Sequence, residues 1–228
     1  MKIIVCVVCL LLGMSSVFGQ YKAVPFERKV FIENNQQFSS ELPEQYKGFE
    51  YCIDNGTQIL FYKDKIVYHF IDRKLEEWKE EEIKESEKGG FKSKEEEERE
   101  REKYKPEHQY IELKWEGAND DAYIEVEGQV QAQYNYIRAI EDSKKPLDIR
   151  CKGYKKLYIR NVYRGVDLEY VFTQNSGEIK YNVLVAETAD FESIKFKYSN
   201  GYGGIEEGNI EVNTILGELK EFAPRTFY

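Results

Sequence analysis

Neighbouring carboxylates are the side chains in this sequence with the clearest potential for chemistry. Asp120 and Asp121 are adjacent, and Asp167 lies in a separate run, 163–167. Carboxylates alone can bind calcium or act as acid and base in glycoside hydrolysis. Asp120 and Asp121, however, directly follow residues 117–119, Gly-Ala-Asn, where a turn favours Asn and Asp for backbone reasons. A turn is therefore the favoured interpretation, and Asp120, Asp121 and Asp167 are kept as candidate ligand residues.

The remaining polar residues form no recognisable catalytic or metal-binding motif. The chain has two histidines, His69 and His108, which are far apart in the sequence. His69 alternates with Val67 and Ile71 in a strand-like run, which favours packing or solvent exposure over catalysis. No G-x-S-x-G, phosphate loop, dinucleotide loop or H-E-x-x-H motif is present. We therefore expect a protein that is not an enzyme, with no catalytic residue, metal or cofactor.

Residues 1–19 have the three parts of a secretory signal peptide. A positive start at Met1-Lys2 precedes an unbroken apolar run, 3–12, and small residues extend to Gly19. The run is shorter than the roughly 20 apolar residues that a membrane-spanning helix needs. We expect cleavage after Gly19, export to the periplasm, cell surface or medium, and no membrane span in the mature chain. The alternative is a buried N-terminal strand.

Two cysteines, Cys52 and Cys151, remain once the expected signal peptide is removed. Each lies in a strand-like run. An even pair in an exported protein permits one disulfide, and strand positions equally permit two buried free thiols. The sequence leaves both alternatives open.

The net charge and the aromatic content limit the classes of partner that this chain could bind. The formal net charge is −9 at pH 7, which argues against nucleic acid because nucleic acids bind basic surfaces. The chain contains 18 Tyr and 13 Phe. Surfaces rich in tyrosine suit contact with a protein or glycan ligand. The ligand itself is not specified by these features.

Alternating apolar and polar residues predict a mainly β fold. Three runs, 49–53, 58–62 and 65–71, read as a meander with a hairpin turn at 54–57. Further strands are expected at 110–115, 123–127, 166–172, 178–185, 193–198, 205–207, 210–212, 213–216 and 218–222. Many short strands with regular turns predict an antiparallel β-sandwich or a bent antiparallel sheet with one solvated face.

One segment, 73–107, interrupts this pattern, since 25 of its 35 residues are charged. Glu80 and Lys84 have the i, i+4 spacing of a helix, and Gly89-Gly90 would interrupt it. We expect a charged helical insertion, projecting or partly disordered, between two parts of one β domain, 20–72 and 108–228. A solvated surface is the favoured interpretation, and a partner-binding arm is the alternative.

Several ordered segments resemble a domain of large bacterial secreted proteins. They begin with an F-x-E-N run and include a Tyr-Arg-Gly-Val-Asp core. The segments are 31–38, 134–137, 162–170, 177–185, 208–212 and 216–224. Together they are similar to the N-terminal β-rich domain of uncharacterised function in secreted proteins of the Bacteroidota. This chain departs from that pattern at Gln36 and Arg164, where the family has Gly and Pro.

The resemblance implies a surface or secreted module with no catalytic residues to carry over. Such proteins often contain β-propeller-type repeats and end in gliding-motility-associated or type IX sorting domains. Because the chain stops at Tyr228, the second part of the β domain is expected to be truncated at its C-terminal end. The expected function is an exported, non-catalytic module that is structural, adhesive or binding. The alternative is a carboxylate-dependent glycan-active or calcium-binding domain.

Overall fold

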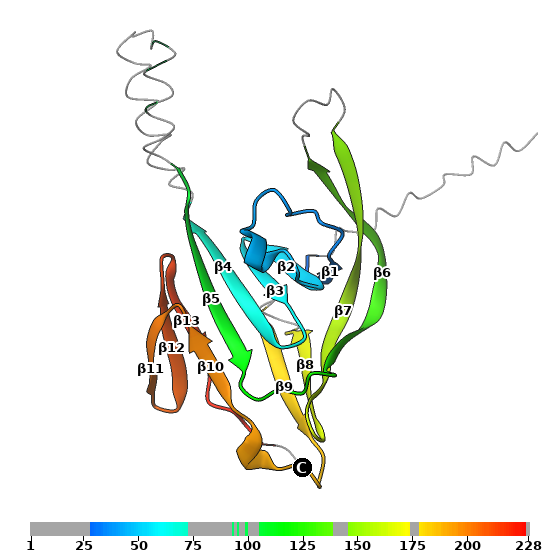
Figure 1. Cartoon of the computed structure of the whole chain (residues 1–228), viewed down its shortest axis with the longest axis vertical. Helices are drawn as coiled ribbons and strands as arrows, with labels where there is room; N and C mark the ends of the chain where they lie inside the picture. The colour runs from blue at the N-terminus through cyan, green and yellow to red at the C-terminus, as the bar shows by residue number, and fades with distance from the viewer. Residues whose placement is uncertain are drawn as a thin grey trace, which may run out of the picture.

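The computed structural model describes residues 28–72, 93, 95, 99, 105–138, 146–173 and 178–226. In this part of the chain the fold is mainly β, and every strand pair is antiparallel (Figure 1). The predicted mainly β class is therefore confirmed. The expected signal peptide, 1–19, lies outside the described residues, and so does nearly all of the charged insertion, 73–107.

The elements follow one another as short strands with two long ones, β6 and β7. The strands are β1 (Phe31–Glu33), β2 (Tyr51–Asn55), β3 (Thr57–Phe61), β4 (Lys65–Asp72), β5 (Glu107–Trp115), β6 (Tyr123–Arg138), β7 (Leu147–Tyr163), β8 (Val166–Phe172), β9 (Ile179–Val185), β10 (Phe196–Ser199), β11 (Tyr202–Glu206), β12 (Asn209–Thr214) and β13 (Gly217–Glu221). The described residues also include the short 3-10 helices η1 (Glu44–Tyr46) and η2 (Phe191–Ser193). Within the described ranges, no helix has the length and apolar character needed to span a membrane.

Among the described strands, ten form one large sheet in the order β10-β5-β4-β3-β2-β1-β7-β8-β9, with β6 paired to β7. The predicted meander corresponds to β2, β3 and β4. Its first turn needs a residue with positive φ, which Gly56 supplies at +88°. Tyr154 of β7 pairs with Gln129 of β6 and with Phe31 of β1. β6 therefore occupies one edge of β7, while β1 and β8 share the other.

The main core joins β1–β5 to β7–β9, since one apolar cluster contains side chains from all of these strands. Phe61 is at its centre and contacts Phe31 and Tyr170 edge to face, with ring centroids 5.4 and 5.2 Å apart. Leu157 and Leu168 are fully buried in the same cluster. Such aromatic pairs add stability beyond the burial of their area. Strands that are distant in the sequence are therefore joined by one apolar core.

A second core covers the opposite face of β2–β4. The segment between β1 and β2 crosses this face (Figure 1), and its side chains Phe38, Leu42, Tyr46 and Phe49 are buried in the second core. Consequently Leu60 and Phe61, which point to opposite faces of β3, are both 0% exposed. The expectation of one solvated face is wrong for β3, because the loop covers the face that would otherwise meet water.

The last three strands form a separate sheet in the order β11-β12-β13. It packs against β4 and β5 through Val212, which is buried with Phe70 and Ile111. The backbone N–H of Ile215 also donates to the side-chain oxygen of Gln109 in β5 at 2.8 Å. The small sheet is thus attached to the large one near β4 and β5.

Candidate functional site

The carboxylates singled out from the sequence are only partly brought together. Asp121 accepts a hydrogen bond from the Asn161 side chain at 3.0 Å, and Asp167 accepts one from the Asn161 backbone N–H at 2.7 Å. Asp167 also forms an ion pair with Arg160 at 2.9 Å. Asp120 is exposed beside Asp121, and both lie in a turn, as the sequence predicts. Two of the three candidates therefore share one neighbour, Asn161.

These contacts give Asp121 and Asp167 a structural role. Asn161 has a φ of +57°, a left-handed conformation that asparagine tolerates better than most residues. It lies where the pairing of β7 with β8 shifts register, and Asn119 donates to its backbone oxygen at 2.9 Å. Asp121 and Asp167 hold this irregular backbone in place. Across the described ranges, no three His, Cys, Asp or Glu side chains are grouped so that they could hold a metal ion.

The outer face of β6–β9 carries a network of paired charges. Arg160 lies between Glu125, at 2.6 Å, and Asp167, and its guanidinium group stacks 4.0 Å over the Tyr158 ring. The Tyr158 hydroxyl donates to Glu169 at 3.0 Å. On this face alternate residues are polar, so the expected solvated face is found here. Its charges already have partners, which favours a structural role.

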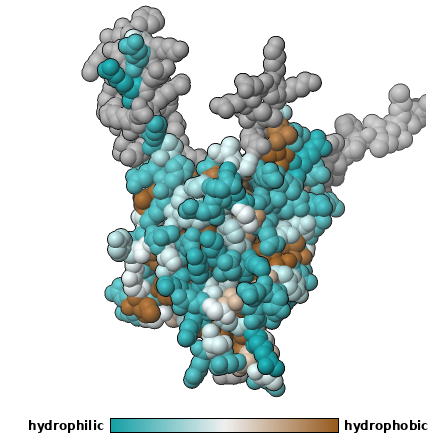
Figure 2. Space-filling view, viewed as in Figure 1, coloured by the Kyte–Doolittle hydropathy of each residue, from teal (hydrophilic) through white to brown (hydrophobic). Residues whose placement is uncertain are grey.

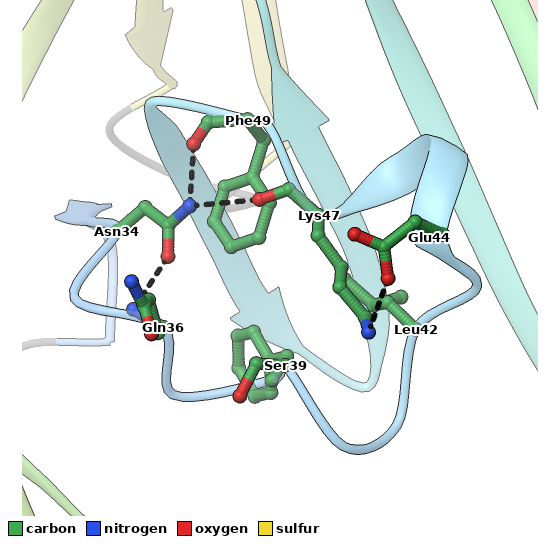
Figure 3. Close-up of a pocket in the computed structure, with 8 residues that line it drawn as sticks. Asn34, Gln36, Ser39, Leu42, Glu44, Lys47 and Phe49 are labelled. Carbon is green, nitrogen blue, oxygen red and sulfur yellow. Dashed lines mark hydrogen bonds and ion pairs between the residues drawn. The ribbon is translucent and has the colours of Figure 1, made fainter.

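The F-x-E-N motif forms a turn braced by its own amides. The Asn34 side-chain nitrogen donates to the backbone oxygens of Phe49, at 2.5 Å, and Lys47, at 3.2 Å. Its oxygen accepts from the Gln36 backbone N–H at 2.8 Å (Figure 3). Gln36 has a φ of +65°, which agrees with the expected preference for glycine at this position. Asn34 thereby joins the start of the loop to its end.

A small hollow of about 340 Å³ lies beside this turn. Phe38, Leu42 and Phe49 supply its apolar side, and Glu44 and Lys47 form an ion pair of 2.8 Å at its rim (Figure 3). Its volume is at the lower end for ligand sites, which hold roughly 300 Å³ or more. Three polar side chains that line it already have partners: Asn34 is bonded to the loop backbone, and Glu44 is paired with Lys47.

Cys52 and Cys151 are both buried free thiols in the structure. They line the second core beneath the Asn34 turn, where the Gln37 side chain contacts the Cys52 sulfur at 3.7 Å. Burial raises the pKa of Cys151 to about 11, although a hydrogen bond to the Asn35 backbone opposes the shift. This arrangement is the second of the two alternatives left open by the sequence. A disulfide between them stays a prediction for the oxidised protein.

The two histidines, which the sequence separates, meet in the structure. His69 is 1% exposed, and its Nδ1 lies 2.8 Å from Gln58 Oε1 while its Nε2 lies 2.8 Å from His108 Nδ1. Since Gln58 Oε1 accepts, His69 carries its proton on Nδ1 and His108 donates to Nε2. The His69 ring stacks on Tyr110 at 4.3 Å. Burial, and secondarily His108, lowers the pKa of His69 to about 4.

Exposed apolar residues gather on the small sheet, a surface that the sequence alone does not single out. In and beside β11–β13, four large apolar side chains are exposed: Tyr202, Ile205, Leu216 and Phe222. Apolar residues are visible over β11 and β12 at the lower left of Figure 2. Residues 202–221 also contain five glutamates and a single lysine. The sheet thus combines exposed apolar groups with an acidic character.

A half-buried carboxylate, Glu221 at the end of β13, anchors this strand to the large sheet. Tyr198 and Tyr181, from the large sheet, donate their hydroxyls to the Glu221 carboxylate, the latter at 3.3 Å. Burial raises the pKa of Glu221, while these two hydrogen bonds oppose the shift. Tyr170, nearby in the main core, has a buried hydroxyl with no hydrogen-bond partner among the described residues. β13 is therefore held by polar as well as apolar contacts.

Replacing Glu221 with glutamine should reduce the pH dependence of stability. A carboxyl with a raised pKa holds its proton more strongly in the folded state, so its stabilisation is lost as pH rises through the folded pKa. The amide carries no charge and still accepts a hydrogen bond. Thermal melts at pH 5 and pH 8 should differ less for Glu221→Gln than for the wild type. Glu218→Gln, on the same strand, is the control, and an equal effect there would contradict the assignment.

Comparison with known proteins gives one result. The chain matches no curated protein and no solved structure. A family model described as a domain of unknown function, DUF7948, matches residues 31–228. The match begins at β1 and includes the braced turn, both cores and the small sheet. The chain therefore belongs to the DUF7948 family of uncharacterised domains.

Proposed function

We propose that this chain is a non-catalytic binding module of an exported protein, and that it binds its partner through the β11–β13 sheet. The observation that supports this most strongly is the exposure of large apolar side chains on that sheet, 89% for Tyr202 and 78% for Ile205. Exposed large apolar side chains that gather on one element mark interaction sites, and tyrosine is enriched at their centres. The charged outer face of β6–β9 supports the proposal indirectly, because its side chains are occupied with one another.

The setting of the module rests on the sequence. The apolar run 3–12 supports export, and the ordered motifs from 31 to 224 resemble domains of secreted Bacteroidota proteins. We infer a bent antiparallel sheet domain, placed near the N-terminus of a larger cell-surface or secreted protein. In that position a domain presents a rigid surface, while repeats and a sorting domain elsewhere provide length and attachment.

Binding to cells tests this proposal. Purified, fluorescently labelled chain should bind to the surface of cells of the source organism, and Tyr202→Ser with Ile205→Ser should lower the binding about tenfold or more, as loss of central interface residues does. The matched control replaces Ile137 and Leu147, two exposed apolar residues of the β6–β7 hairpin, with serine. Equal loss in both double variants, or unchanged binding in the first, would count against the β11–β13 sheet.

A further inference from the structure

We propose that β11 is a docking edge for an extended basic peptide segment of a partner protein, which joins the small sheet as a fourth strand. This inference rests on the proposed function, since it names the partner class for the same sheet. It follows from three properties of β11: an open backbone edge, side chains suited to hold a neighbouring strand, and an acidic surrounding.

The backbone edge of β11 is open. Among the described strands it pairs with β12 alone, and all five of its residues are exposed. Natural edge strands are usually protected by lysine, proline, a bulge or a covering segment. The sequence of β11, Tyr-Gly-Gly-Ile-Glu, has neither lysine nor proline, and its register with β12 is continuous from Tyr202 to Glu206. An edge of this kind is suited to strand addition.

The side chains of β11 would hold an added strand from both faces. Tyr202 pairs with Asn213 on the outer face, and Ile205 pairs with Ile210 on the face toward the large sheet. Between them, a Cβ at Gly204 would have no atom within 4 Å, which leaves room for large side chains of a neighbouring strand. A Cβ at Gly203 would lie 2.1 Å from the Glu211 backbone oxygen, so glycine is required there.

The charges around β11 select a basic partner. On the outer face Glu206, Glu211 and Glu218 surround Lys220, which forms an ion pair with Glu211. The pKa of Lys220 is raised by its hydrogen bond to Glu211 and further by the charges of Glu218 and Glu206. Because Lys220 can neutralise only one of these three glutamates, the outer face keeps an excess of negative charge. A second copy of this chain would bring a like acidic edge, and like charges directly opposite each other are unfavourable.

The test uses a blocked seven-residue peptide of alternating lysine and valine with the full chain. Amide hydrogen exchange, read by NMR, should show new protection at residues 202–206 when the peptide is added. Two control peptides have the same length: one carries glutamate in place of lysine, and the other has alternate backbone amides methylated. Each should bind at least about tenfold more weakly, since the first loses charge attraction and the second loses strand hydrogen bonds. Glu206→Lys with Glu218→Lys should weaken the basic peptide similarly, whereas Glu187→Lys, outside the sheet, should not.

The outcomes separate this inference from the proposed function. Equal binding of the methylated peptide, or protection outside β11, would overturn strand addition. The chain could instead form dimers at higher concentration that protect residues 202–206 without peptide. The partner of β11 would then be a second copy of the chain, and this result would also overturn the inference. In each case a loss of cell binding in the Tyr202→Ser, Ile205→Ser variant would leave the binding role of the sheet standing. Retention of cell binding in that variant would overturn the proposed function as well.

Discussion

Replacing Asn34 with alanine is expected to lower the free energy of unfolding by about 3 kcal/mol. The side chain makes three hydrogen bonds, to the backbones of Gln36, Lys47 and Phe49, and each contributes about 1 kcal/mol. Their loss would free both ends of the loop that covers the second core. For a chain of this size, the midpoint of thermal unfolding should fall by roughly 6–12 °C.

Asn135→Ala is the matched control for this prediction. Asn135 is an exposed asparagine of β6, and exposed substitutions of this kind change stability by about 0.5 kcal/mol or less. Chemical denaturation of both variants gives the comparison directly. Similar losses in the two proteins would mean that the Asn34 amide does not brace the loop. A smaller denaturant slope for Asn34→Ala alone would show that the loop detaches in the folded state.

Acidification should destabilise the protein through His69. The folded pKa of about 4 lies below the ordinary value of about 6.5, so the unfolded chain binds the proton more readily between these values. The stabilisation from neutral His69 is therefore complete above about pH 6.5 and is lost as pH falls toward 4. The shift corresponds to about 3 kcal/mol. Urea unfolding from pH 7 to pH 4 should show this loss in the wild type.

Two variants isolate the contribution of His69. His69→Gln removes the titrating group, so its stability should vary less between pH 7 and pH 4 than that of the wild type. His108→Gln keeps His69 buried and should retain most of the slope, because burial is the larger cause of the shift. If His69→Gln and the wild type show parallel pH profiles, the buried imidazole is not the source of the acid sensitivity.

The meander was predictable because its information is local. Residues 49–71 alternate in polarity, and Asn55-Gly56 provides the positive φ that the turn requires. The burial of β3 on both faces was not predictable in this way. It depends on the loop carrying Phe38 and Phe49, whose position is set by tertiary contacts. β1 is too short for an alternating pattern to identify it as a strand.

The contact between His69 and His108 could have been predicted from the sequence with one further assumption. If the charged segment is taken as an insertion within a hairpin, β4 and β5 become neighbours. The observed register pairs Ile71 with His108 and His69 with Tyr110, which places His69 and His108 on one face, two residues apart. The docking edge is harder to predict, since the glycines at 203 and 204 indicate a loop. These glycines lie in a strand instead, and glycine is needed at 203 because β11 approaches β12 too closely there for a side chain.

The pairing of Asp72 with Glu107 has a consequence for how this domain can vary. The two residues are the last paired positions of β4 and β5, so the chain leaves and re-enters the sheet at neighbouring points. The entropy of closing a loop rises only slowly with its length. We therefore expect the free energy of unfolding to depend only weakly on how many residues are placed between these two positions. The geometry of this hairpin suits it as a grafting point, and we expect segments of very different size to be exchanged there without a change of strand register.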